Sequence, residues 1–336
     1  MNAGSIEPFF PILVSTICPC IMRKCYFAGL LLAILSIPSC STGTMLAERP
    51  VDALSLPVAD PFILYEDGAY YLYGTGAANG IAVYVSRDLH NWNREPDLAL
   101  HKKDSYGEKW FWAPEVYHVG DKYYMYYSAE ERICVATADS PTGPFVQAIH
   151  EPIIPYGAID NSLFFDKDGK PWLFFVKFNH GNQIWSARLE DDLMHIKSGT
   201  EKKCLEMDQE WEKVLPTVNE GPFVLYHGGL YYLTYSANGY QSPQYGIGYA
   251  TSNSPAGPWT KYEGNPIYQC VGGLEGVGHH AFFHDAKGKR RIVFHSHYAP
   301  GRIQPRITHI SDYLFEKDGT LVISPKFFTP WTTQNE

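Results

Sequence analysis

The sequence predicts an all-β fold, a five-bladed β-propeller that forms a single domain. One pattern recurs five times along the chain: a lead residue, a short apolar run, a turn, and a second apolar or aromatic run. The copies begin at Asp60, Ala113, Asp160, Glu220 and His279. Their similar spacing favours repeated blades over a β-sandwich, which is the main alternative for a chain with many short strands. Turns rich in Gly and Pro, together with the lack of long helical periodicity, agree with a propeller.

Each copy is expected to form a β-hairpin. In the first repeat, Asp67 and Gly68 separate the apolar run 62–65 from the aromatic run 70–73. A turn dipeptide between two such runs is a strong short-range hairpin signal. Gly228 and Gly229 take the same place in the repeat that begins at Glu220.

Further short β-like runs follow the hairpins and predict four strands in each blade. They lie at 81–85, 133–137, 184–189 and 246–251. The last strands are expected near 306–310 and 321–323, with Asp318 and Gly319 in the turn between them. To close the ring, we expect a strand near one end of the chain to complete a blade with the other end.

The first 40 residues are predicted to be an N-terminal extension and signal peptide. Arg23 and Lys24 precede an apolar run at 27–37, which is too short to span a bilayer as a stable helix. The following Pro38–Ser39–Cys40 resembles the lipobox of bacterial lipoproteins. That resemblance implies cleavage before Cys40, lipidation of its thiol, export, and anchoring to a bacterial membrane at the cell surface or in the periplasm. Met22 is a second candidate for the true start.

Domain boundaries follow from this arrangement. Residues 41–56 are small, polar and punctuated by proline, which predicts a tether. Residues 57–330 are then the propeller and catalytic domain. The chain has 27 Lys and Arg against 36 Asp and Glu residues. This balance argues against a nucleic-acid partner, because binding of phosphates needs clustered positive charge. A neutral or polar small substrate fits the composition better.

The lead residues are the candidate catalytic groups. The innermost strand of each blade lines the centre of a propeller, so Asp60, Asp160 and Glu220 are expected to share one pocket. Like charges that are buried together push their pKa values apart, which separates an acid from a base. Two carboxyl groups on opposite walls of a pocket are the requirement for glycoside hydrolysis. Each acid alone could cap a turn, but three in register favour a catalytic site.

Aromatic and basic residues supply candidates for substrate and metal binding. Trp112 and Phe111 precede the lead residue Ala113, and a flat aromatic face can stack on a sugar ring. Because neighbouring residues of a strand face opposite sides, Trp112 is the stronger candidate of the two. His279 could bind a hydrated cation or a substrate hydroxyl, whereas we expect His280 to be a core residue. Arg306 begins an apolar strand, where a guanidinium group is expected to pair with a carboxylate or hold a sugar hydroxyl.

Taken together, these motifs resemble glycoside hydrolase family 43. The resemblance covers roughly residues 57–323 and rests on ADPF at Asp60, WAPEV at Trp112, AIDNSLFFDKDG around Asp160, NEGPF at Glu220, YGIGYATSNSPAGPW, and GVGHH at His279. It implies an inverting mechanism in a five-bladed propeller. Asp60 would be the general base, Glu220 the general acid, and Asp160 the neighbour that raises the pKa of the acid and orients it. Asn161, which follows Asp160 in its motif, is added as a substrate-binding candidate.

The resemblance also implies a class of substrate and a possible ion. We expect an enzyme that removes arabinofuranosyl or xylosyl residues from plant polysaccharides or oligosaccharides. An endo-arabinanase or a galactan-active hydrolase of the same fold remains open, as does a non-catalytic carbohydrate-binding propeller. No cofactor is expected for the chemistry, although His279 matches the position at which many members hold a structural calcium ion. The protein is expected to act as a monomer and to touch a membrane only through its lipid anchor.

Overall fold

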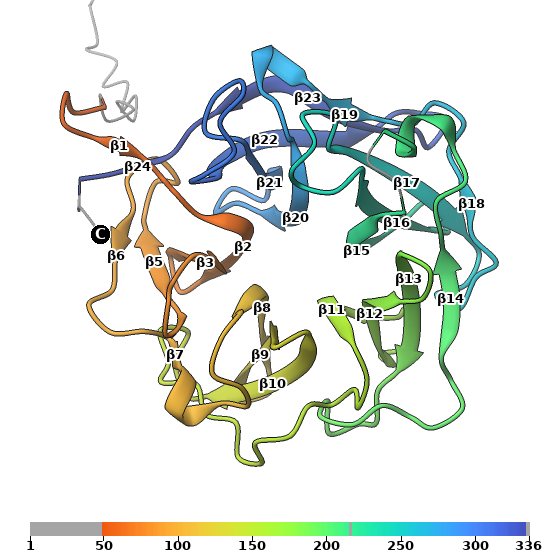
Figure 1. Ribbon diagram of the computed structural model, residues 1–336, viewed down its shortest axis with the longest axis horizontal. Helices are drawn as coiled ribbons and strands as arrows, with labels where there is room; N and C mark the ends of the chain where they lie inside the picture. The colour runs from red at the N-terminus through yellow and green to blue at the C-terminus, as the bar shows by residue number, and fades with distance from the viewer. Residues whose placement is uncertain (1–48, 215–216, 334–336) are drawn as a thin grey trace, which may run out of the picture. The chain divides into compact units, whose positions relative to one another are not determined.

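The computed structural model describes residues 49–214 and 217–333. The predicted signal peptide, the lipobox Cys40 and residues 41–48 of the predicted tether lie outside these residues. Five antiparallel sheets stand around a common centre, with the first strand of each sheet innermost (Figure 1). The five-bladed β-propeller predicted from the sequence is therefore confirmed. In the described part of the chain, no helix is long and apolar enough to cross a membrane.

Four of the five blades contain at least four antiparallel strands. The first blade is β2 (Ala59–Glu66), β3 (Ala69–Thr75), β5 (Val83–Ser86) and β6 (Asn93–Arg94). The third is β11 (Ala158–Phe165), β12 (Pro171–Phe178), β13 (Asn182–Arg188) and β14 (Lys202–Leu205). The fourth is β15 (Asn219–His227), β16 (Leu230–Ala237), β17 (Gly246–Ser252) and β18 (Thr260–Lys261), with β19 (Tyr268–Gln269) also paired to β17. The fifth is β20 (Gly278–His284), β21 (Arg290–Ser296), β22 (Ile307–Phe315) and β23 (Leu321–Phe328).

The second blade differs from the predicted four strands. It consists of β8 (Trp112–Val119), β9 (Lys122–Ala129) and β10 (Arg132–Ala138). A single bridge between Thr137 and Val146 stands where a fourth strand would be. The remaining short elements are the pair β4 (Gly80–Ile81) and β7 (Leu100–His101), and the 3₁₀ turns η1 (Lys102–Asp104), η2 (Glu210–Glu212) and η3 (Val271–Gly273).

Closure of the ring differs from the expectation that one end of the chain completes a blade with the other. The first and fifth blades are each built from a continuous stretch of chain. A separate two-stranded ribbon joins the ends instead, in which β1 (Leu54–Ser55) pairs with β24 (Trp331–Thr332). Trp331 also exchanges backbone hydrogen bonds with the first blade, donating to His90 O at 2.8 Å and accepting from Trp92 N at 2.9 Å.

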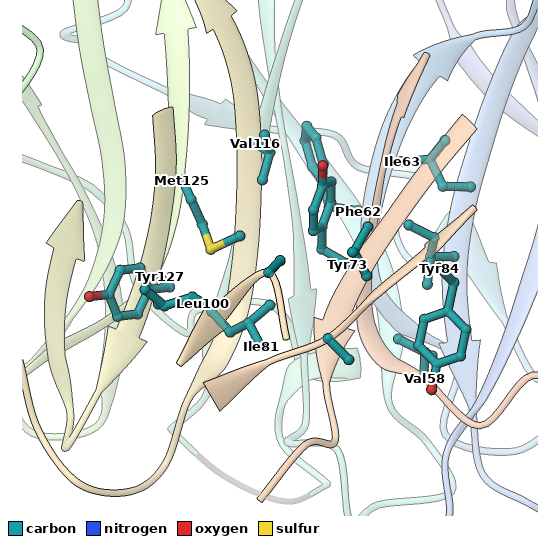
Figure 2. Close-up of a cluster of buried hydrophobic side chains, with 14 of the residues drawn as sticks. Val58, Phe62, Ile63, Tyr73, Ile81, Tyr84, Leu100, Val116, Met125 and Tyr127 are labelled. Carbon is teal, nitrogen blue, oxygen red and sulfur yellow. The ribbon is translucent and has the colours of Figure 1, made fainter. Parts of the chain in front are cut away.

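The hydrophobic core fills the spaces between adjacent blades. Between the first two blades, Phe62 and Tyr73 pack with Val116, Met125 and Tyr127 from the second (Figure 2). Each fully buried apolar side chain of this size contributes roughly 1.5–3 kcal/mol of burial free energy. This packing fixes the distance between neighbouring inner strands, and thereby the positions of residues at the centre.

Each inner strand carries a β-bulge at the same place. The bulges show that the register predicted for the fourth repeat is one residue off. The backbone φ angle is positive at one residue in each bulge: Asp60 (49°), Ala113 (44°), Asp160 (54°), Gly221 (55°) and His279 (43°). The structural equivalent of Asp60 in the fourth blade is thus Gly221, and Glu220 stands one position earlier. The repeat predicted from the sequence begins at the acid, although glycine is the residue that takes a positive φ angle most readily.

Candidate active site

A pocket of about 740 Å³ collects most of the residues predicted to be functional. Asp60, Trp112, Asp160, Glu220, His279 and Arg306 all line it. The bulges explain how Glu220 reaches this pocket in spite of its shifted register. Where two residues oppose one on the partner strand, the alternation of side chains is interrupted. As a result Glu220 and the neighbouring lead positions face the same space.

Asp60 is held as an ionised carboxylate. Arg306 donates to both of its oxygens, from Nη1 to Oδ1 at 2.6 Å and from Nη2 to Oδ2 at 3.2 Å. The Nδ1 atoms of His279 and His295 each lie 3.3 Å from Oδ1. Burial alone would raise the pKa of Asp60, but Arg306 and then the two histidines hold it well below its ordinary value. Asp60 is therefore available as a proton acceptor at any pH near neutrality.

The pKa of Glu220 is shifted in the opposite direction, upward. Burial, and then the negative charge of the nearby Asp160, raise the pKa of its carboxyl group to about 7. Tyr245 donates its hydroxyl to Oε1 at 2.8 Å, and Asn182 donates Nδ2 to Oε2 at 3.1 Å. These two hydrogen bonds orient the carboxyl group while it retains its proton near neutral pH, as a general acid requires.

Asp160 interacts both with Asp60 and with the strand that carries Glu220. Burial, and then the negative charge of Asp60, raise the pKa of Asp160 to about 7. Its Oδ2 accepts a hydrogen bond from the backbone N–H of Gly221 at 3.1 Å, and this contact lowers the pKa. Asp160 is thereby tied to the residue that directly follows Glu220 in the chain.

His279, the residue expected to hold a cation, lies among the charged groups of the pocket. Its Nδ1 lies 3.3 Å from Asp60 Oδ1 and 3.9 Å from Asp160 Oδ2, so the ring faces the carboxylates. Calcium takes six to eight oxygen ligands, whereas the Asp60 oxygens are already engaged by Arg306. Over residues 49–214 and 217–333, no group of three or more His, Cys, Asp or Glu side chains is arranged to hold a metal ion. We therefore assign no chemical step to a cation.

The two aromatic candidates, Trp112 and Phe111, lie in different surroundings. Trp112 lines the pocket, and Trp110 stacks against it with ring centroids 5.7 Å apart. Phe111 is instead a core residue, only 3% exposed and stacked on Tyr127. It does not line the pocket, so a contact with substrate is not supported. The physical reason is that Phe111 points into the space between blades, away from the centre.

Asn161 and His280 lie behind the pocket wall. Asn161 is buried, and its Nδ2 is 3.4 Å from the carbonyl oxygen of Ala113 in the neighbouring blade. It does not line the pocket, which favours a structural role over the substrate contact expected from the sequence. His280 is buried beside Phe282, and its Nε2 lies 2.7 Å from Thr234 Oγ1. The core position expected for His280 agrees with this placement.

Three functional contacts were missed by sequence reasoning. His295 accepts the backbone N–H of Asp60 at Nδ1, at 3.1 Å, while Tyr245 and Asn182 hold Glu220. His295 stands in the second strand of its hairpin, and its pairing with Gly278 could have indicated a position beside the centre. Asn182 belongs to the third blade and Tyr245 directly precedes β17, and nothing in the linear spacing relates them to Glu220.

The arrangement can perform acid and base chemistry on a neutral substrate. The pKa of one buried carboxyl group is held below its ordinary value and that of another is raised to about 7, and both groups border a pocket that also presents a tryptophan ring. Such a division of roles between carboxyl groups is the requirement for hydrolysis of a glycosidic bond.

Comparison with known proteins identifies relatives that act on glycans. The crystal structure of an endo-1,4-β-xylanase from Bacteroides thetaiotaomicron VPI-5482 is 46% identical, with a TM-score of 0.81, and the match covers 84% of this chain and 99% of that one. The extracellular endo-α-(1→5)-L-arabinanase 2 of Bacillus subtilis is 26% identical over 380 residues, which cover 91% of this chain and 77% of its own. A β-D-galactofuranosidase of Aspergillus niger is 27% identical over 297 residues, covering 79% and 81% respectively.

These relatives differ in the sugar and linkage that their names state, so they agree on glycan hydrolysis and disagree on its target. The match to a family model is more decisive than any single relative. Residues 48–321 match the model of glycosyl hydrolases family 43, nearly the full extent of the propeller. The chain belongs to glycoside hydrolase family 43.

Proposed function

We propose that the protein is an inverting glycosidase that removes arabinofuranosyl or xylosyl residues from plant cell-wall polysaccharides or oligosaccharides. The observation that carries this proposal is the opposite shift of two pKa values in one pocket, below the ordinary value for Asp60 and up to about 7 for Glu220. Asp60 acts as the general base and removes a proton from the attacking water. Glu220 acts as the general acid and protonates the leaving oxygen.

The roles of the other groups follow from their contacts. Arg306 keeps Asp60 ionised and oriented through its two hydrogen bonds. Asp160 adds the negative charge that raises the pKa of Glu220 and holds the backbone beside it. Trp112 offers a flat face against which a pentose ring can stack, because sugar C–H groups pack on aromatic rings.

The proposal is tested with Glu220→Gln and Asp60→Asn. Each substitution keeps the shape of the side chain and removes its acid or base function. We expect Asp60→Asn to lose at least about 10²-fold in kcat on nitrophenyl arabinofuranoside or xyloside, and Glu220→Gln to lose as much on natural oligosaccharides, whose leaving oxygen must be protonated. Proton NMR of the first product should show the inverted anomer. Turnover by Glu220→Gln at the wild-type rate on both pentosides and natural oligosaccharides would contradict the assigned role of Glu220.

An endo-acting hydrolase is the second candidate, and the relatives favour it. The Bacteroides enzyme and the Bacillus enzyme are both described as endo-acting, the first on a 1,4-β-linked xylan and the second on arabinan. Product analysis on xylan and on debranched arabinan separates the two modes. Release of monosaccharide alone supports removal of terminal residues, whereas a ladder of oligosaccharides supports internal cleavage.

A non-catalytic binding propeller is the alternative of another class. It would bind sugars in a calorimetric titration and show no turnover on a broad glycan panel. Burying carboxyl groups with raised pKa values has no evident benefit for binding alone, because their ionisation is costly there.

For the location of the protein, we propose export and lipid anchoring through Cys40. An extracellular relative supports export, and mass spectrometry of the N-terminal peptide would test the anchor.

A further inference from the structure

A second cavity adjoins the active pocket on the first blade. Its volume is about 940 Å³, against about 740 Å³ for the active pocket. We call it the side trough. It is lined by the loop 76–79, which follows β3, and by the segment 94–98, which runs from the end of β6 toward β7. Four residues, Pro57, Thr75, Gly76 and Thr332, line both cavities. The geometry points to a binding site in which the side trough holds further sugar units of the glycan whose cleaved unit occupies the active pocket.

The shared border favours a ligand that occupies both spaces at once. Gly76 stands at this border and is exposed, and an added Cβ atom there would meet only the Pro57 carbonyl oxygen, at 3.9 Å. Gly76 therefore places no side chain between the cavities. Gly74, two residues earlier, is different, because a Cβ there would lie 2.3 Å from Val58 Cγ1. The glycine at 74 is needed for packing, whereas the one at 76 leaves the border open.

The chemistry of the side trough suits a neutral, polyhydroxylated ligand. Asn79, Arg94 and Glu95 bring an amide, a guanidinium and a carboxylate to its walls. These groups donate and accept hydrogen bonds, and their charges of opposite sign give no net preference for an anion or a cation. Leu98 and Pro96 supply apolar surface between them. Such mixed walls match sugar rings, which present hydroxyl groups around apolar C–H faces.

The volume of the side trough also suits a short stretch of sugar chain. Pockets for small ligands measure roughly 300–1,000 Å³, and a di- or trisaccharide falls within this class. A substrate that fills both cavities is therefore a chain of several sugars, and recognition should improve as the chain grows into the side trough. This inference rests on the proposed function, because it assigns the same glycan to both cavities.

Filling the side trough tests the inference. Ala78 is exposed and lines the side trough but not the active pocket. We expect Ala78→Trp to reduce kcat/KM on a five- or six-unit xylo- or arabino-oligosaccharide about tenfold, which corresponds to the loss of one good sugar contact. Activity on a nitrophenyl pentoside, which cannot reach the side trough, should stay within about twofold of wild type. Asn79→Ala should show the same selectivity with a smaller loss.

The control is Ala286→Trp, because Ala286 is an exposed alanine in the turn between β20 and β21 that lines neither cavity. It should leave the dependence of kcat/KM on chain length unchanged. Equal effects of Ala78→Trp on long and short substrates, or no effect on either, would overturn the inference. If wild-type protein cleaves no pentoside, the proposed function fails, and the side trough is then judged by calorimetry of Glu220→Gln with and without Ala78→Trp on the same oligosaccharides. Equal affinity of the two would count against it.

Discussion

Asp160 accepts the backbone N–H of Gly221, and in doing so it takes a place that a different side chain holds at the other four bulges. The N–H groups of the other lead residues Asp60, Ala113, Asp160 and His279 are bound by His295, Thr75, Ser128 and Ser236 respectively. Each of these four acceptors stands in the second strand of the preceding blade. Each also pairs in register with the residue before its own blade's lead. The equivalent position in the third blade is Val176, which has no acceptor atom.

This exception links the structure of the ring to its chemistry. Because Val176 cannot bind the N–H of Gly221, the carboxylate of Asp160 does so and is drawn toward the strand that carries Glu220. The same carboxylate raises the pKa of Glu220 through its charge. A buried N–H that lost its acceptor would cost roughly 1–3 kcal/mol, so Asp160 has a structural role beside its electrostatic one.

The structural role can be isolated with Val176→Thr. In the parent protein the N–H of Gly221 is already bound, so a threonine hydroxyl at 176 should add little stability. In Asp160→Ala the N–H has lost its acceptor, and Val176→Thr should raise the melting temperature by about 2 °C without restoring activity. Val135→Thr, at a buried valine in β10, should change the two backgrounds equally. Additive effects of Val176→Thr and Asp160→Ala on melting temperature would contradict this account.

Activity should decrease on the alkaline side of its pH profile. Glu220 must be protonated to act as the acid, and its pKa is raised to about 7. We expect kcat/KM to decline as the pH rises through about 7, because the proton is then lost. Asp60 must be ionised, and since its pKa lies below the ordinary value, little activity should be lost down to about pH 4. A profile of kcat/KM between pH 4 and pH 9 measures both limbs.

Stability should follow the same ionisation. A carboxyl group whose pKa is higher in the folded state binds more protons folded than unfolded at pH values between the two pKa values. The free energy of unfolding therefore decreases as the pH rises from about 4.5 to about 7. Glu220→Gln removes this titration, so its melting temperature relative to wild type should increase between pH 5 and pH 8. A constant difference over that range would show that Glu220 ionises as easily in the folded protein as in the unfolded chain.

The hydroxyl of Tyr245 should tune the acid. Its hydrogen bond to Glu220 lowers the pKa of that carboxyl group, so Tyr245→Phe should move the alkaline limb of kcat/KM to higher pH. The loss of orientation should also reduce kcat by about tenfold. Tyr126→Phe is the matched control, because Tyr126 donates its buried hydroxyl to the carbonyl oxygen of Leu193. That variant should lose stability and keep the wild-type pH profile.

Arg306 should control the acidic limb. Without its guanidinium group, burial would raise the pKa of Asp60. Arg306→Lys keeps the charge and loses the two-point contact, so the acidic limb should move toward neutral pH, and Arg306→Met should move it further. Removing one partner of a buried ion pair should also cost about 3–5 kcal/mol of folding stability. Arg291→Lys alters an ion pair with Asp285 and Asp312 in the fifth blade and should leave the pH profile unchanged.

The sequence predicted the blades and most of the pocket because both depend on a repeated local signal. Turn glycines and apolar runs mark each hairpin, and the residue at the head of each inner strand lies near the axis. Glu220 was placed in the pocket although its register was one residue off, since the bulge directs both Glu220 and the lead positions inward. Phe111 shows the opposite case, because it lies one residue before β8 and is buried against Tyr127, a contact that no repeated local signal indicates.

Contacts between blades could not be predicted in the same way. Asn182 and His295 reach the carboxyl groups from the neighbouring blade, and their positions depend on the rotation of one blade relative to the next. Tyr245 reaches Glu220 from the segment just before β17 of the same blade, 25 residues later in the chain. The closing ribbon is similar. Its two strands are only two residues long each, which is too short for a periodic signal, and they pair because the ends of the ring are brought together by the packing of five blades.

Trp331 should connect closure of the ring to the shape of the active pocket. It is buried in β24 and packs against the ring of His90, with centroids 5.5 Å apart. Leu54 and Thr332 of the same ribbon line the active pocket, so loosening the ribbon should disturb a wall of the site. Trp331→Ala should cost about 3–5 kcal/mol of stability, measured by urea denaturation, and should raise KM more than it lowers kcat.

Trp211→Ala provides the comparison, because Trp211 packs against Tyr235 in the fourth blade and lines neither cavity. It should reduce stability and leave KM close to the wild-type value. If the two variants changed KM to the same degree at temperatures where both are folded, the ribbon would have no specific role at the site. A rise in KM confined to Trp331→Ala would show that the contact between the two ends of the chain shapes the wall against which the substrate binds.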